Sequence, residues 1–127
     1  MAVVLSTAAR NAMLDPLVTL INVGTPFGKL KIRDSGSVVL ATILLADPCA
    51  PAASGGVLTF TVPAEDASAD ATGTADNAII TDANDLTIIS GLTVGVGGSF
   101  NVDMVTVSIV ITEPVIITAM TITAGNA

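Results

Sequence analysis

Six carboxylates gather in the middle of the chain and are the first candidates for chemistry: Glu65, Asp66, Asp70, Asp76, Asp82 and Asp85. Carboxylates at this density can ligate Ca²⁺ or act as a paired general acid and base. The run from Asp82 to Asp85 lacks the spacing of a calcium loop, because no glycine follows it and no glutamate closes it. No basic residue lies nearby in the sequence to tune a carboxylate pair. The favoured interpretation is a solvated acidic segment that keeps a chain of low charge soluble.

Two further motifs carry weaker signals. The glycines between Gly91 and Gly98 have the composition of a phosphate-binding loop, but they precede an expected strand, and no lysine follows them. Cys49 has no base or cation beside it in the sequence that would activate its thiol, so it is interpreted as a packing residue. A Ser–Lys catalytic pair would require Lys29 or Lys31, and both are expected to point outward from a strand.

The composition excludes most common catalytic and metal-binding groups. The 127 residues include no His and one Cys. Imidazole bases, Ser-His and Cys-His pairs, His-ligated metals, an internal disulfide and a zinc site are therefore excluded. We expect a protein that is not an enzyme and that needs no cofactor.

The chain is apolar without resembling a membrane protein. Its longest charge-free stretches, Pro48–Ala64 and Leu86–Val102, are shorter than a membrane span and are interrupted by Pro or Gly. The first residues, MAVVLSTAAR, lack the basic segment that opens a signal peptide. We expect neither membrane association nor secretion.

The surface must carry few charges. Hydrophobic residues make up 51% of the chain, and charged residues make up 12%, which is about half the usual fraction of roughly 25%. The 4 basic and 11 acidic residues give 15 formal charges on a folded surface of about 6,200 Å². Such a surface is typical of a subunit that neighbouring subunits cover.

The charges are distributed unevenly. All four basic residues lie within the first 33 positions: Arg10, Lys29, Lys31 and Arg33. The residues after position 33 carry ten acids and no base. An acidic body repels nucleic acid, so no nucleic-acid partner is expected.

Three of these basic residues form the candidate interface of the chain. Lys29, Lys31 and Arg33 alternate with Leu30 and Ile32, so the three charges should project from one face of a strand about 7 Å apart. Their natural complement is an acidic patch on a neighbouring subunit. The alternative is a solvated edge strand whose lysines discourage aggregation.

A helix is expected over about residues 7–22. Its apolar residues recur every three to four positions: Leu5, Ala8, Ala9, Ala12, Met13, Leu17, Leu20 and Ile21. Ser6 or Thr7 can cap the start, and Gly24 can end it. Pro16 either kinks one helix or opens a second one that Asp15 caps.

From about residue 28 to residue 124 the apolar period changes to two, which predicts strands. Hairpins are expected at 29–33 with 38–45, through the turn 34–36, and at 78–81 with 86–89, through 82–85. Single strands are expected at 57–62, 100–112 and 115–123. The first of these places Leu58, Phe60 and Val62 inward. The second has a bulge near Met104 and Val105, where the inward set changes from Phe100, Val102 and Met104 to Val105, Val107, Ile109 and Ile111. The last has Ile116, Met120 and Ile122 on one face. The intervening ranges 64–73 and 91–98 are expected as an exposed loop and a connector.

The pattern predicts a single domain over residues 1–127. Its fold class is mainly β, a β-sandwich or jelly-roll-like domain of about 7–8 strands with one N-terminal α-helix. Short strands of Thr, Val and Ile with so few charges would aggregate through bare edges, so the edges are expected to be paired or covered in an assembly.

Four segments resemble small virion proteins of tailed bacteriophages: Ala9–Asp15 (ARNAMLD), Gly28–Gly36 (GKLKIRDSG), Leu44–Pro48 (LLADP) and Val115–Thr123 (VIITAMTIT). The resemblance implies a head protein of the decoration, or cement, type that binds the outside of the capsid shell. The partners it implies are the major capsid protein and further copies of the chain in a homo-oligomer. It also implies synthesis in the host cytoplasm and a final location on the capsid surface of the virion.

The function expected from the sequence is therefore that of a non-enzymatic structural subunit. It would bridge capsid subunits through aliphatic and main-chain contacts. Two alternatives stay open: a tail or neck component, and an extracellular β-sandwich module for binding or adhesion. The absence of Trp and Tyr speaks against sugar stacking in such a module.

Overall fold

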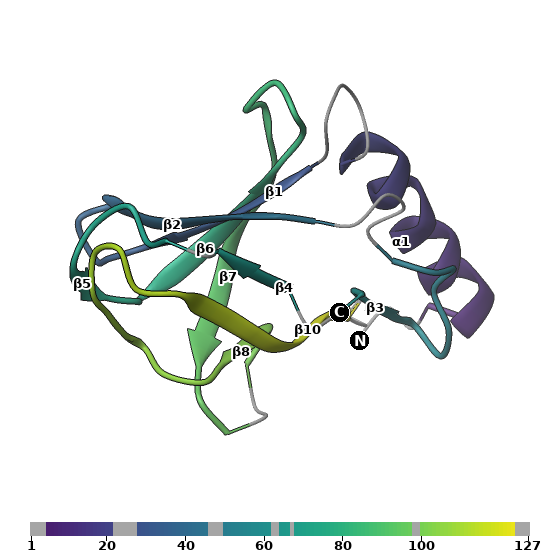
Figure 1. The fold of residues 1–127 in the computed structure, drawn as a ribbon. Helices are drawn as coiled ribbons and strands as arrows, with labels where there is room; N and C mark the ends of the chain where they lie inside the picture. The colour runs from purple at the N-terminus through teal and green to yellow at the C-terminus, as the bar shows by residue number, and fades with distance from the viewer. Residues whose placement is uncertain are drawn as a thin grey trace.

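The computed structural model describes residues 5–21, 28–45, 50–61, 64–66, 68–97 and 100–123, with the side chains of residues 64 and 65 excepted. These residues form one helix and ten strands, α1 (Thr7–Ile21), β1 (Lys29–Arg33), β2 (Val39–Leu44), β3 (Val57–Thr59), β4 (Ala64–Asp66), β5 (Gly73–Thr74), β6 (Asn77–Thr81), β7 (Thr87–Gly95), β8 (Val102–Met104), β9 (Ser108–Ile109) and β10 (Val115–Thr123) (Figure 1). The prediction of a mainly β, sandwich-like domain with one N-terminal helix is confirmed.

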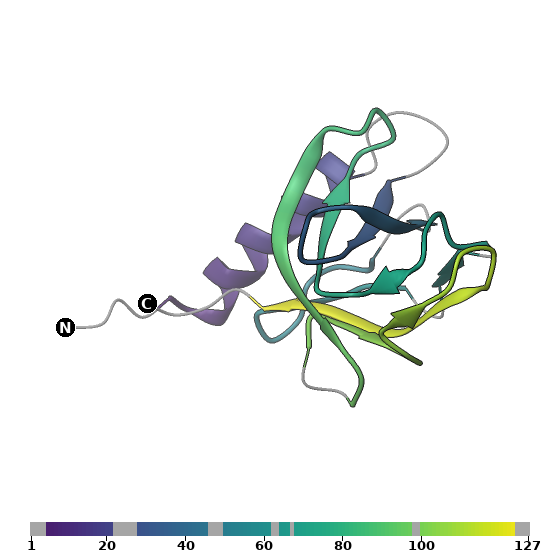
Figure 2. The ribbon, with the colours of Figure 1, turned by 90° about the vertical axis from the view of Figure 1, so that its left-hand side faces the viewer.

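Eight of the strands form one curled sheet. The hydrogen-bonded order is β2-β1-β6-β7-β8-β10-β3, and β4 pairs with β10 on the side opposite to β8. The β7–β8 pair is parallel, and the other pairs are antiparallel. β5 and β9 form a separate two-stranded sheet. Figure 2 shows how the strands wrap around a common interior, with α1 on one side.

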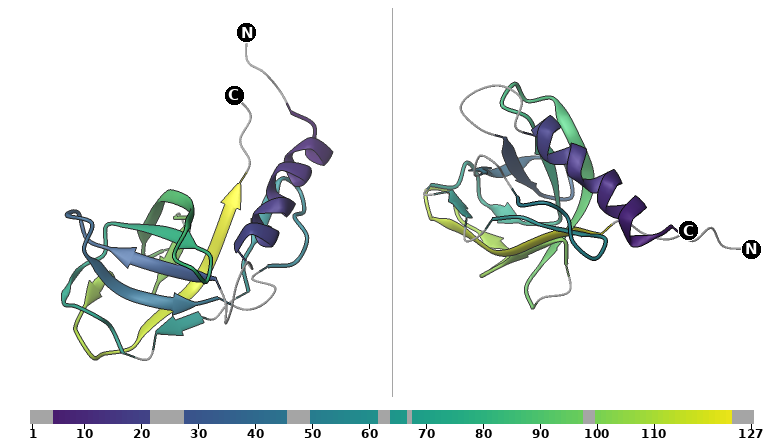
Figure 3. Two further views of the ribbon diagram at one scale, coloured as in Figure 1. Left: turned by 90° about the horizontal axis from the view of Figure 1, so that it is seen from above. Right: turned by 90° about the vertical axis from the view of Figure 1, so that its right-hand side faces the viewer.

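The two ends of the curled sheet meet at a seam between β2 and β4. The backbone N–H of Thr42 in β2 donates to Oδ2 of Asp66 in β4 at 3.0 Å. The carbonyl of Leu40 accepts from the N–H groups of Asp70 and Ala71 at 2.7 and 3.2 Å. These bonds take the place of a regular strand ladder, and Figure 3 shows β2 and β4 side by side.

The core fills the interior of this closed sheet. The largest fully buried side chains come from both ends of the chain, and the set includes Ile21, Leu30, Ile32, Leu40, Ile43, Leu58, Phe60, Ile80, Val102, Ile117 and Met120. On β1 the burial alternates residue by residue, with Leu30 and Ile32 inside. The expected orientation of β1 is therefore confirmed.

Helix α1 is continuous, although Pro16 lies inside it. The hydroxyl of Ser6 accepts from the N–H of Ala9 at 3.1 Å and caps its start, as expected. The carboxylate of Asp15 accepts from the N–H of Ala53 at 2.7 Å, so it ties the helix to the 50–56 segment and caps no second helix.

The expected apolar stripe of α1 is partly wrong. Leu14 and Ile21 are the buried residues, with Leu17 and Val18 packed against the core, whereas Met13 and Leu20 are 56% and 48% exposed. Apolar residues lie on both sides of this helix, so periodicity alone could not select the buried side.

Both expected hairpins are confirmed: β1 pairs with β2, and β6 pairs with β7. The carboxylate of Asp34 holds the first turn by accepting from the N–H groups of Gly36 and Val38 at 2.8 and 2.9 Å. The same role in the second turn belongs to Asp82, which accepts from Asn84 and Leu86.

The expected loop at 64–73 and the expected connector at 91–98 are wrong. The first contains β4 and the start of β5, which backbone pairing with β10 and β9 stabilises despite the acidic sequence. In the second, β7 continues to Gly95. Gly91 adopts a φ of +74° where the pairing with β6 shifts register, so this glycine forms a bulge in the strand.

The expected long strand at 100–112 is also wrong. β8 ends at Met104, and Val105 is 59% exposed where an inward orientation was expected. Phe100 and Ile111 are exposed as well, whereas Val102, Met104 and Ile109 are buried as expected. After Met104 the chain no longer forms a strand beside β10, because β9 pairs with β5 instead. The alternation of buried and exposed side chains does not continue across this change of strand partner.

β10 has the expected bounds, but a register shift between Ile117 and Ala119 changes its inward set. Val115, Ile117 and Met120 are buried, while Ile116 is exposed, contrary to expectation. The predictions for five residues lie outside the described part of the chain: Asn22, Gly24, Cys49, Val62 and Gly98.

Candidate interaction surfaces

The candidate interface residues lie on a strand in the interior of the sheet. β1 pairs with β2 on one side and with β6 on the other. The alternative of an exposed edge strand is therefore wrong. The long side chains of Lys29 and Lys31 remain partly exposed on the outer face of the sheet.

Both lysines pair with one carboxylate of their own chain. Nζ of Lys29 lies 2.9 Å from Oδ1 of Asp85, and Nζ of Lys31 lies 3.0 Å from the same oxygen. Asp85 follows the tight turn that Asp82 holds, and it adopts a φ of +67°. Hydrogen bonds and charge from Lys29 and Lys31 lower the pKa of the Asp85 carboxyl below its usual value. Two cations on one anion leave this cluster with one net positive charge.

Arg33 pairs with an amide. Its Nε donates to Oδ1 of Asn77 at 2.9 Å. The Asn77 amide group in turn donates to the carbonyl of Asp34 and to Asp76 Oδ2. The structure thus brings Lys29 and Lys31 together at Asp85 and places Arg33 in a separate polar network. Their role as an interface stays a prediction.

The acidic residues have structural roles that the sequence did not indicate. Asp66 and Asp70 both bind Thr42, through its N–H and its hydroxyl, and Asp82 holds the β6–β7 turn. Within the described ranges, no three His, Cys, Asp or Glu side chains gather closely enough to hold a metal ion. No helix there has the length and apolar character needed to cross a membrane.

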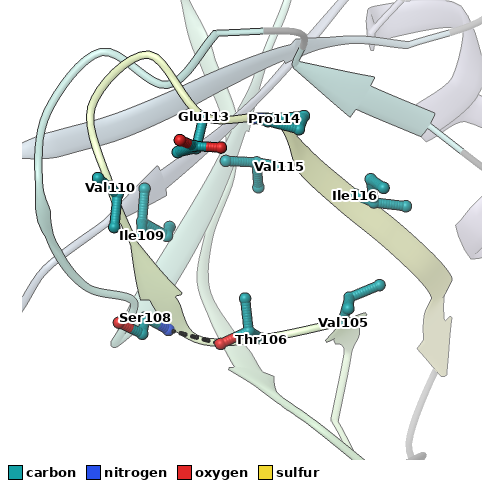
Figure 4. Close-up of a pocket in the computed structure, with 9 residues that line it drawn as sticks. All are labelled: Val105, Thr106, Ser108, Ile109, Val110, Glu113, Pro114, Val115 and Ile116. Carbon is teal, nitrogen blue, oxygen red and sulfur yellow. Dashed lines mark hydrogen bonds between the residues drawn. The ribbon is translucent and has the colours of Figure 1, made fainter.

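An apolar groove opens between β9 and β10, and the sequence did not predict it. It encloses about 280 Å³, and its walls include Val105, Ile109, Val110, Glu113, Val115 and Ile116. Figure 4 shows Ile109 and Val110 on one wall and Val115 and Ile116 on the other. The groove exists because β9 leaves β10 to pair with β5. We call it the β9–β10 groove.

The outward side of α1 is a second apolar surface. Met13 and Leu20 are exposed there, and a shallow hollow is lined by Ala12, Pro16 and Leu20 together with the polar Asp15 and Thr19. We call Ala12, Met13, Pro16 and Leu20 the outer face of α1. α1 and the β9–β10 connection lie on opposite sides of the molecule in all three ribbon views (Figures 1, 2 and 3).

Comparison of the chain with models of known protein families, with curated proteins and with solved structures finds no match.

Proposed function

We propose that this chain is a non-enzymatic structural subunit of a tailed-phage virion, and specifically a decoration protein that binds the outer surface of the capsid shell. The proposal rests on the resemblance of its four segments to small phage virion proteins and on the character of its surface. Its partners are the major capsid protein and further copies of itself.

The observation that carries the proposal is the amount of apolar side chain left uncovered. Within the described residues, eleven large hydrophobic side chains are exposed, and four of them surround or adjoin the β9–β10 groove: Val105, Val110, Ile111 and Ile116. The whole chain carries 15 charges (4 basic and 11 acidic) on 6379 Å² of accessible surface. Patches of this kind mark surfaces that a partner covers.

The physical role is to add contacts between capsid subunits. A specific interface buries about 800 Å² of each partner, which is about one eighth of the surface of this chain. Burial of apolar side chains stabilises the assembly. The curled sheet gives these contacts a packed support, because its interior is filled and its ends are joined through Thr42 and Asp66.

Two other functions are weighed against this one. A tail or neck subunit needs the same kind of surface, and an extracellular adhesion module needs a ligand-binding face. The β9–β10 groove has aliphatic walls and contains no aromatic side chain among its described lining residues, which disfavours a carbohydrate ligand.

Gene neighbourhood and virion composition test the proposal. A decoration protein is expected beside genes for a capsid protein and its protease, and mass spectrometry of purified virions should detect it in the head fraction. Detection in isolated tails would favour the tail or neck alternative. A gene beside a secretion system, with no protein in purified virions, would overturn the proposal.

A further inference from the structure

We propose that the β9–β10 groove receives one large apolar side chain of the major capsid protein, and that a lysine or arginine beside this side chain pairs with Glu113. The inference rests on the proposed function and deepens it, because it names the chemistry of the partner segment. Its test uses the purified chain and short synthetic peptides.

The groove is closed at both ends. At one end the N–H of Val105 donates to the carbonyl of Ile116 at 3.4 Å, and at the other the N–H of Glu113 donates to the carbonyl of Val110 at 3.0 Å. Between these two bonds the walls separate, because β9 pairs with β5 (Figure 4). A partner strand could not lie between the walls without breaking one of the bonds. The groove therefore admits a side chain, and the partner's backbone stays outside.

The size and walls of the groove suit an apolar side chain. An apolar cavity of about 150 Å³ is enough to hold a benzene ring, and this groove encloses about 280 Å³. Val105, Val110 and Ile116 line it and are exposed. A side chain that fills the groove and covers these three removes apolar surface from water, which supplies the affinity.

The border of the groove is acidic. Glu113 is the one charged side chain among its lining residues, and it is exposed. The backbone of Ala69 bonds to Thr112 and Glu113, and Asp66 is paired with Val115 in the β4–β10 ladder, so the acidic segment 66–70 adjoins the groove. Within the described ranges, the carboxylate of Glu113 forms no ion pair. Charge complementarity favours an occupant with a cation beside its apolar side chain.

The lysines of the chain do not supply such a cation. Lys29 and Lys31 share the carboxylate of Asp85. Leu86 follows Asp85 and is exposed, but Asp82 in the same turn offsets the remaining positive charge. The β6–β7 turn of a second copy therefore offers an apolar side chain without a net positive charge.

The two arginines are also engaged within the chain. Nε of Arg33 donates to Asn77. The guanidinium of Arg10 packs against Gly56, where a Cβ atom would lie 2.6 Å from its Nη1. The exposed charge beside the outer face of α1 is that of Asp15, which has the same sign as the border of the groove. The occupant that fits is therefore a segment of another protein.

Three capped peptides test the two parts of the recognition. Acetyl-Gly-Leu-Lys-Gly-amide carries both features, acetyl-Gly-Ala-Lys-Gly-amide lacks the large side chain, and acetyl-Gly-Leu-Glu-Gly-amide reverses the charge. The first should shift the methyl NMR signals of Val110 and Ile116 saturably, with a Kd of roughly 1 mM. The alanine peptide should bind about fivefold more weakly or worse, and the glutamate peptide about threefold more weakly or worse.

Variants at the border test the charge. In Glu113→Lys, the order of the two leucine peptides should reverse, so that the glutamate peptide binds more tightly. In Glu113→Gln, the two should bind nearly equally. An unchanged preference for the lysine peptide in Glu113→Lys would overturn the assigned role of Glu113.

A variant in the wall tests the place of binding. Val110→Glu should abolish the methyl shifts of Ile116 caused by the lysine–leucine peptide. Leu86→Glu is the matched control, because Leu86 is 65% exposed on the β6–β7 turn, away from the groove, and it should bind as the wild type does. Circular dichroism establishes that each variant is folded. If Val110→Glu does not fold, the peptides and the Glu113 variants still decide the question.

Two further outcomes would overturn the proposal. One is a wild-type chain whose groove methyl signals do not respond to any of the three peptides at 10-fold the expected Kd, roughly 10 mM. The other is self-association, measured by sedimentation velocity, that Val110→Glu abolishes and Leu86→Glu retains, because a second copy would then occupy the groove.

The proposed function fails separately. Peptide binding of the predicted kind by a chain that is missing from purified virions would retain the groove's specificity and overturn the decoration role. A chain that binds capsid shells equally well as wild type and as Val110→Glu would retain the decoration role and overturn the groove as its contact.

Discussion

Thr42 and Asp66 join the two ends of the curled sheet. The backbone N–H of Thr42 donates to Oδ2 of Asp66 at 3.0 Å, and Oδ1 of the same carboxylate accepts from the N–H of Ser68 at 3.1 Å. One side chain thus bridges β2, β4 and the following turn. A donor at a sheet edge that would otherwise be exposed or unpaired is satisfied inside the chain.

Replacement of this bridging carboxylate should loosen the seam. Asp66→Ala leaves a partly buried N–H group without its acceptor, which costs about 1–3 kcal/mol in the free energy of unfolding. Hydrogen exchange at the Thr42 amide should accelerate. Asp76→Ala is the control, because Asp76 is exposed and accepts from a side-chain amide only. Equal stability losses in the two variants would contradict the special role of the seam.

The pKa of Asp85 should depend on β1. Lys29 and Lys31 hold it below the ordinary value of 3.8, so Lys29→Met and Lys31→Met should each raise it toward that value in a carboxyl titration followed by NMR. Because the folded-state pKa is depressed, the pair stabilises the fold above about pH 4. That stabilisation is lost as the pH falls through the lowered pKa.

Arg33→Met is the control for this titration, since Arg33 donates to Asn77 and is not among the groups that lower the pKa of Asp85. It should leave the Asp85 titration unchanged. An Asp85 pKa that does not respond to either lysine would show that the two ion pairs do not persist in solution.

Gly28 should tolerate no side chain. A Cβ atom there would lie 2.7 Å from the carbonyl oxygen of Ile21 and 3.3 Å from that of Thr81, and it would also meet the Ile21 side chain. Backbone atoms cannot move aside cheaply, so Gly28→Ala should cost about 1–3 kcal/mol in thermal or denaturant unfolding. Gly36→Ala, whose Cβ would meet only Asp34 Oδ1 at 3.4 Å, should be nearly neutral. Equal effects of the two changes would contradict the close approach of α1 to β1.

Of the three basic residues on β1, Arg33 should contribute most to assembly. The triple change of Lys29, Lys31 and Arg33 to Gln should fold normally and weaken binding to the capsid. Arg33→Gln alone should cause most of the loss, because Arg33 pairs with no carboxylate in the described structure, whereas the lysines pair with Asp85. Binding should also weaken as the salt concentration rises past about 0.15 M. Binding that is insensitive to both changes would leave apolar and main-chain contacts as the cause of association.

The sequence predicts those parts of the fold that local pattern determines. The alternation in β1, the Asp34 turn and the Ser6 cap are encoded by residues next to one another, and all three are confirmed. β10 also has its expected bounds.

Predictions failed where partners distant in the sequence decide the structure. β4 exists because β10 pairs with it, and β8 ends early because β9 pairs with β5. The groove results from that second change of partner, so no local signal indicates it. The pairing of Lys29 and Lys31 with Asp85 depends in the same way on β6 lying beside β1. The outward Val105 is the one residue that could have warned of the break, since it interrupts the alternation after Met104.

The most direct test of the account is a cryo-electron microscopy map of the virion whose genome encodes this chain. The decoration role predicts density for the curled sheet and its helix on the outer surface of the capsid shell, repeated at equivalent lattice positions. The β9–β10 groove and the outer face of α1 should be covered by neighbouring subunits in that map. Density for the chain in the tail or neck only, or a shell whose outer surface lacks it, would contradict the account.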